Sequence, residues 1–248
     1  MFQTYRWVAM NNAVGGEATR DLANRATRAI AATMGVVVGF GSIDHGVLEC
    51  LQGTRPTTGL IVNALGPGYR WSVWKQGGEG AFTLLPNFLL SGIVATLLGV
   101  LMIVWALCLL QSRRGSIVFL SLGVTSFLTG GGVAQVVLFT LTWAVARKIS
   151  TPLPFWRGIL PATAQPILGR IWPWTLTAST MLFLAALEIA VFGYVPGVSD
   201  QLELLHICWG ILGAALTLYL VSVFSGFIQD AESAERRSEA QILLKDRR

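Results

Sequence analysis

Apolar residues occur along this chain in long blocks, separated by short segments that are polar or contain proline and glycine. The blocks are close to the ~20 residues that a helix needs to cross the ~30 Å hydrocarbon core of a bilayer. Shorter alternating segments of about ten residues, typical of an outer-membrane barrel, do not occur. The pattern predicts four full membrane spans, at 29–51, 86–111, 174–193 and 204–228.

A further apolar segment, 116–146, has no charged residue and contains the run Thr129-Gly-Gly-Gly132. Consecutive glycines destabilise a helix by about 1 kcal/mol each relative to alanine, so the run Gly130, Gly131, Gly132 predicts a break. At ~1.5 Å per residue, the limbs on either side are too short to cross a bilayer alone. The segment is either one long tilted helix or a helical hairpin that enters and leaves on the same side.

The distribution of lysine and arginine favours the hairpin. With a hairpin, 15 of the 18 Lys and Arg residues lie on one side of the membrane and 3 on the other; with a single crossing, 6 and 12 do. Lys and Arg concentrate in cytoplasmic connections. We therefore predict an all-α polytopic transmembrane bundle of four full spans plus a glycine-broken helical hairpin, with five spans as the alternative.

This topology divides the chain into three parts and places both termini in the cytoplasm. Residues 1–28 form a cytoplasmic N-terminal segment, 29–228 the transmembrane helical domain, and 229–248 a charged cytoplasmic tail. Charged residues make up only 12% of the chain, against about 25% in soluble domains. The net charge of +5 comes from basic residues in connections and tails, which indicates orientation in a lipid bilayer rather than binding of nucleic acid.

Small residues follow one face of the first span: Gly35, Gly39, Ser42, Gly46 and Gly53, with Glu49 in the same row. Steps of three and four residues place side chains on one helix face. Small residues at this spacing let a neighbouring helix approach closely. We call this row the glycine seam, and it predicts packing of the first span against another helix, of the same protein or of a membrane partner.

The outer part of the first span also carries ionisable side chains. Such residues inside a membrane usually face a protein interior or a water-filled cavity and mark functional sites. The hairpin topology places further polar residues at similar depth, and the full candidate cluster is Asp44, His45, Glu49, Asn87, Glu188 and His206. In the five-span alternative, Glu188 and His206 lie in the opposite leaflet and the cluster dissolves.

These features leave several functions open. The first is a non-enzymatic membrane protein that packs against itself or a partner through the glycine seam. The second is a small cation- or proton-linked transporter or channel component that uses Glu49, His45 and Glu188. A haem or metal site on His45 and His206 is a weaker hypothesis, because two histidines without fixed spacing are a poor ligand set, and no cofactor is expected.

Catalytic motifs are missing from the sequence. It contains neither H-E-x-x-H nor G-x-S-x-G, and its three cysteines form no C-x-x-C pair. We therefore expect no enzyme activity.

The order of four motifs resembles an uncharacterised family of bacterial multi-pass membrane proteins. The matching stretches are Gly41-Ser-Ile-Asp-His-Gly-Val-Leu-Glu-Cys-Leu-Gln-Gly53, Leu85-Pro-Asn87, Gly130-Gly-Gly132 and Leu168-Gly-Arg-Ile-Trp-Pro-Trp174. The resemblance covers residues 30 to 230 and implies a bacterial cytoplasmic membrane, but no activity. In that family prolines follow the triple glycine, whereas this chain has Val133-Ala134-Gln135, a departure that bears on the hairpin.

Overall fold

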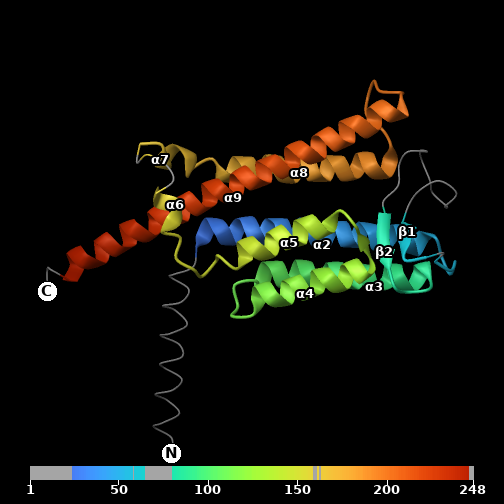
Figure 1. Cartoon of the computed structure of the whole chain (residues 1–248), viewed down its shortest axis with the longest axis horizontal. Coiled ribbons are helices and arrows are strands. Elements are labelled where there is room, and N and C mark those ends of the chain that lie inside the picture. The colour runs from blue at the N-terminus through green and yellow to red at the C-terminus, as the bar shows by residue number, and fades with distance from the viewer. Residues whose placement is uncertain (1–23, 58, 65–79, 159–160, 162, 246–248) are drawn as a thin grey trace, which may run out of the picture.

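The computed structural model describes residues 24–57, 59–64, 80–158, 161 and 163–245, and these are mostly helical. The long helices run along one axis and form an elongated bundle (Figure 1). The helices are α2 (Arg25–Leu51), α3 (Phe88–Cys108), α4 (Gly115–Leu128), α5 (Gln135–Ala146), α6 (Phe155–Gly158), α7 (Gln165–Leu168), α8 (Trp172–Phe192) and α9 (Gln201–Lys245), and the strands are β1 (Ile61–Asn63), β2 (Gly80–Thr83) and β3 (Thr129–Gly132).

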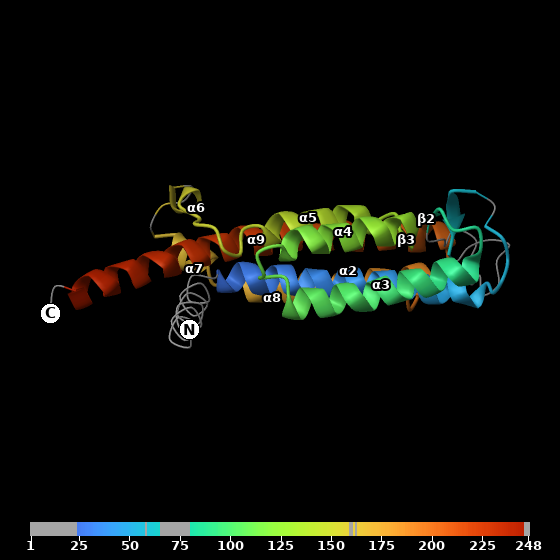
Figure 2. The same ribbon diagram turned by 90° about the horizontal axis from the view of Figure 1, so that it is seen from below.

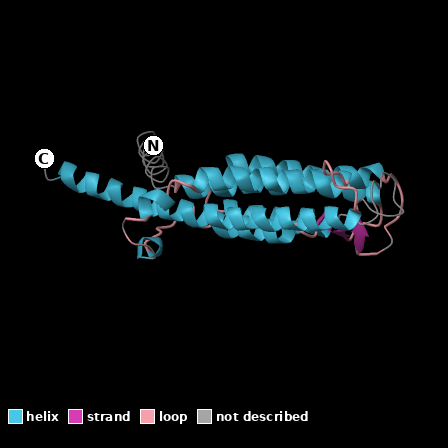
Figure 3. Cartoon of the chain, turned by 90° about the horizontal axis from the view of Figure 1, so that it is seen from above, coloured by secondary structure: helices cyan, strands magenta, loops and turns pink. Residues whose placement is uncertain are grey.

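Four of these helical regions are long and apolar enough to cross a membrane: α2, α3, the region 165–192 that contains α8, and 201–239 within α9. The four predicted spans are therefore confirmed, with the first beginning at Arg25 instead of residue 29. The predicted tail at 229–248 continues α9 as far as Lys245 without a break, so that α9 projects beyond the bundle (Figure 3). Its residues favour a helix, and Arg236 pairs with Glu232 one turn earlier.

The segment 116–146 forms a helical hairpin. Helices α4 and α5 are shorter than a full span and lie side by side, joined by β3 (Figure 2). The chain leaves α5 beside the start of α2, where the Asn24 amide donates to the Ile149 carbonyl at 2.8 Å and Asn24 Nδ2 donates to the Lys148 carbonyl at 2.7 Å. The hairpin therefore returns to the end of the bundle at which α2 begins.

A small three-stranded antiparallel sheet lies at the opposite end, and the sequence analysis did not predict it. Its order is β1-β2-β3, with Ala81 opposite Gly132 and Thr83 opposite Thr129. The sheet forms because the glycine run leaves the helical conformation. Its buried backbone amides and carbonyls then need hydrogen-bond partners. Strand β2 supplies them, so the break predicted at the triple glycine is an extended strand and not a loose turn.

The glycine seam of α2 packs against glycines of α3 in the same chain. A Cβ atom on Gly39 would lie 2.7 Å from the Gly99 carbonyl oxygen, and one on Gly46 would lie 2.6 Å from the Gly92 carbonyl oxygen. The two backbones are therefore in direct contact, as in close-packed membrane helices. At Gly39 and Gly46 the seam therefore packs within the chain, against α3.

The other seam positions have separate environments. Ser42 donates from its hydroxyl to the Ala95 carbonyl of α3 at 3.0 Å, and a Cβ on Gly35 would lie 2.7 Å from the Ala106 Cβ. Gly53 follows the end of α2, has a φ of 72° and faces open space. It terminates the helix in the left-handed conformation that glycine favours.

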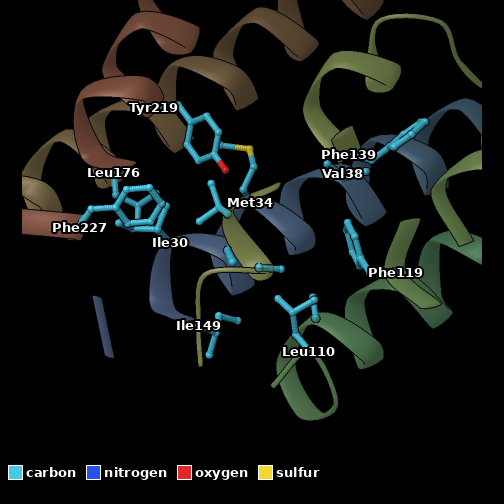
Figure 4. Packing of buried hydrophobic residues seen from close by; sticks show 14 of the residues in the cluster. Ile30, Met34, Val38, Leu110, Phe119, Phe139, Ile149, Leu176, Tyr219 and Phe227 are labelled. Carbon is cyan, nitrogen blue, oxygen red and sulfur yellow. The ribbon is translucent and has the colours of Figure 1, made fainter. Parts of the chain in front are cut away.

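Helix α2 lies at the centre of the bundle and contacts α3, α5, α8 and α9. Its buried residues Ile30, Met34 and Val38 pack within the main hydrophobic core. The core also receives Phe119 and Phe139 from the hairpin, with Tyr219 and Phe227 from α9 (Figure 4). The packing thus joins the α8–α9 pair and the hairpin to one central helix.

Asp230 of α9 fixes the beginning of α2. Its carboxylate accepts hydrogen bonds from the Ala26 amide at 3.1 Å, the Thr27 amide at 2.8 Å and the Thr27 hydroxyl at 2.7 Å. The first amides of a helix lack partners within the helix and favour negative charge. A residue more than two hundred positions away in the sequence therefore supplies the cap.

Candidate functional site

The tip of the hairpin lies against the end of α2 that carries His45 and Glu49. A Cβ atom on Gly130 would lie 2.5 Å from Glu49 Oε2, and one on Gly132 would lie 2.7 Å from His45 Cε1. Gly130 also has a φ of 109°, a conformation that residues with a side chain rarely adopt. Glycine is therefore required here, because the backbone must both turn and approach the two ionisable side chains.

Glu49 is fully buried, with 0% of its surface exposed. Neither carboxylate oxygen meets a donor at full hydrogen-bonding geometry among the described residues. Its interacting neighbours are the Ser91 hydroxyl and the His45 imidazole. The Ser91 hydroxyl is within hydrogen-bonding distance of Thr83 Oγ1, at 2.8 Å, and of the Thr129 carbonyl, at 3.1 Å.

This environment has a chemical consequence. A carboxylate inside an apolar interior costs several kcal/mol unless a proton, a cation or strong donors compensate its charge. Glu49 has no ion pair with lysine or arginine among the described residues. A bound proton or cation would relieve this cost.

Buried hydroxyls surround β3 (Thr129–Gly132), the glycine strand. Ser91 of α3 and Ser126 of α4 both lie against it, Ser126 Oγ lies 2.6 Å from Ser42 Oγ of α2, and Thr83 of β2 is buried as well. Sequence reasoning did not identify Thr83, Ser91 or Ser126, because single hydroxyls in apolar segments follow no pattern. Only the position of the hairpin tip reveals them.

The structure brings together only part of the predicted polar cluster. His45 and Glu49 meet at the hairpin tip, and Asp44 is half-buried on α2. Asn87 has another function: it accepts from the Leu90 amide at 3.2 Å and donates to the Thr54 carbonyl at 3.0 Å, and so caps α3. It does not reach the site.

Glu188 and His206 do not join the cluster either, because both are exposed on the surfaces of α8 and α9. The face that joins these helices includes Ala186 and Cys208, whose Sγ donates to the Ala186 carbonyl at 3.5 Å. Glu188 and His206 are each two residues from this contact, or about 200° around the helix. The predicted topology gave the correct end of the bundle for both residues. The rotation of α8 and α9 about their axes, however, directs both side chains outward.

A shared metal or haem centre on the two histidines is not supported. His45 is buried at the hairpin tip, whereas His206 is exposed on α9. Within the described part of the chain, no three His, Cys, Asp or Glu side chains gather as a metal site.

Comparison of the chain with protein-family models, curated proteins and solved structures finds no match.

Proposed function

We propose that the protein is a non-enzymatic multi-pass protein of a bacterial cytoplasmic membrane, and that Glu49 binds a proton or a small cation as part of a transport or channel function. The observation that carries this proposal is the full burial of Glu49 with neither oxygen fully hydrogen-bonded. Ionisable residues inside membranes mark ion and proton pathways. Histidine, adjacent here, exchanges protons near neutral pH.

The glycine strand supports the same proposal. Extended backbone at membrane depth is tolerated where it lines a cavity or is buried in protein. Around Glu49 the strand adds the Thr129 carbonyl, and α3 adds the Ser91 hydroxyl, which donates to that carbonyl at 3.1 Å. Carbonyl, hydroxyl and carboxylate oxygens are the ligands that hard cations prefer, and hydroxyls both donate and accept protons.

Packing against a partner is the less supported function. It would use the glycine seam, and α3 of the same chain already covers that seam. A partner would need another surface, and the seam contributes to the fold of the bundle instead.

We infer the orientation from the positive charges. The described basic residues lie almost entirely at the end where α2 begins: Arg25, Arg28, Arg113, Arg114, Arg147, Lys148, Arg170, Arg236 and Arg237. At the sheet end, Arg55 is the one basic residue within the described ranges. Lys and Arg mark the cytoplasmic side, so both termini face the cytoplasm and the Glu49 site lies toward the outside.

Thiol labelling tests this orientation. In a protein with Cys50, Cys108 and Cys208 replaced, Ser199→Cys is expected to react with a membrane-impermeant reagent in intact cells. Ser112→Cys, exposed at the opposite end, is the matched control and should react only after permeabilisation. Labelling of Ser112→Cys in intact cells, with Ser199→Cys protected, would reverse the orientation.

Flux measurements test the role of Glu49. In proteoliposomes, Glu49→Gln is expected to reduce proton or cation flux at least about tenfold, because the amide keeps the shape but binds no positive charge. Proton, sodium and potassium gradients are applied separately to identify the ion. Asp200→Asn changes an exposed carboxylate at the same end of the bundle and should leave the flux unchanged. Equal flux in wild type and Glu49→Gln, with both monodisperse, would refute the proposal.

A further inference from the structure

The two short helices between α5 and α8 are held against α9 at the end of the bundle where α2 begins. Helices α6 and α7 lie beside α9 as it leaves the bundle (Figures 1 and 2). Trp156 of α6 packs against Phe227 of α9, with 5.0 Å between the ring centroids. The Ser225 hydroxyl of α9 donates to the Leu168 carbonyl of α7. Both short helices therefore have a fixed position on the bundle.

Three exposed residues follow one side of the chain from α7 into α8. Ile167 is 70% exposed and Trp174 is 78% exposed, and Arg170 between them is exposed as well. The Arg170 amide donates to the Ile167 carbonyl at 3.2 Å. The Trp174 amide donates to the Ile171 carbonyl at 3.1 Å, so the chain follows helical turns here. Steps of three and four residues place Ile167, Arg170 and Trp174 on one side, which we call the α7 face.

The composition of the α7 face suits the boundary between hydrocarbon and headgroups. Trp174 lies in the first turn of α8, which belongs to a helical region long and apolar enough to cross a membrane. Tryptophan is enriched at the headgroup level of a bilayer. Water would leave the side chains of Ile167 and Trp174 uncovered, whereas lipid chains remove their apolar surface from water. The face is therefore better covered by lipid than by water.

Charge selects the kind of lipid. The sequence has no acidic residue between Arg147 and Leu187, and Arg170 forms no ion pair within the described ranges. A guanidinium binds phosphate oxygens through paired N–H donors. A zwitterionic headgroup also brings an ammonium group, which the basic residues at this end repel, whereas an anionic headgroup brings none.

We propose that the α7 face binds anionic phospholipids of the leaflet at this end of the bundle. Arg170 binds the headgroup phosphate, and Ile167 and Trp174 lie against the upper part of the acyl chains. This assignment rests on the exposed face and its charge, and is independent of ion binding at Glu49.

Fluorescence quenching tests it with defined lipids. The full-length protein is placed in phosphatidylcholine nanodiscs with rising fractions of phosphatidylglycerol or phosphatidylcholine that carries a nitroxide on the same acyl carbon. The difference between the protein and Trp174→Phe isolates the emission of Trp174. We expect half of the maximal quenching at an about fivefold lower fraction of labelled phosphatidylglycerol, the effect of one arginine near an anionic surface. High salt should reduce this difference.

Two arginine variants complete the test. Arg170→Gln should bring the half-quenching fractions of the two lipids together. Arg113→Gln removes the same charge from the exposed turn after α3, which lies on the opposite side of α2 from α7 (Figure 1), and should keep the fivefold difference. If neither lipid quenched Trp174, water or another protein would cover the face and the proposal would fail. Equal quenching by both lipids in the unaltered protein, or an unchanged preference in Arg170→Gln, would also overturn it.

Discussion

Replacing Gly46 with leucine is expected to prevent the bundle from folding. A Cβ at this position would lie 2.6 Å from the Gly92 carbonyl oxygen and 2.7 Å from the Thr96 amide nitrogen. Both are backbone atoms of α3, so they can yield only if the two helices separate. Overpacking a core costs about 1–3 kcal/mol when side chains can adjust, and here the cost is expected to exceed about 3 kcal/mol. The monodisperse fraction after extraction and the Tm in detergent measure the effect.

Gly213→Leu is the matched control. Gly213 also lies in a spanning helix, α9, but nothing is within 4 Å of the position of its Cβ. The same substitution there should leave the protein monodisperse, and it removes the helix penalty of glycine, about 1 kcal/mol relative to alanine. If Gly46→Leu proved as stable as Gly213→Leu, the close contact between α2 and α3 would be contradicted.

Replacing Gly130 with valine is expected to have the second largest effect, on both stability and the site. The φ of 109° disfavours a β-branched residue, at about 1–3 kcal/mol. The new side chain would also collide with Ser91 Oγ and Glu49 Oε2, which adds about 1–3 kcal/mol. The hairpin tip should therefore move away from α2, with a lower Tm and loss of the flux that depends on Glu49.

Gly197→Val separates the two causes. Gly197 has a similar φ of 83°, but open space around the position of its Cβ. Gly197→Val should lose only the stability that the strained backbone conformation costs, and it should retain flux. Wild-type flux in Gly130→Val would contradict the contact between the hairpin tip and Glu49.

The features that could be predicted from the sequence are those with a repeating pattern. The spans follow from block length, the hairpin from Gly130–Gly132 with the Lys and Arg distribution, and the contact face of α2 from three- and four-residue spacing. Each depends on physics local to one segment. Glu49 stood out because an acid in an apolar span is costly wherever the helix packs.

The remaining features depend on tertiary contacts that no local pattern reports. Strands β1 and β2 have three and four residues, too few for a period-two pattern to be recognised. The depth of Glu188 and His206 followed from topology, but their outward direction depends on how α8 and α9 rotate against each other. Ser91 and Ser126 become site residues only because the glycine strand packs against both of them.

Infrared difference spectroscopy on the full-length protein in lipid bilayers tests the assignment of Glu49 most directly. Lowering the pH, or removing the transported cation, should produce the carbonyl band of a protonated carboxyl group in a dry environment. We expect this band to be present in wild type and in Asp44→Asn, and to be absent in Glu49→Gln. A band that persists unchanged in Glu49→Gln would show that Glu49 takes up no proton, and would contradict the ion-binding site.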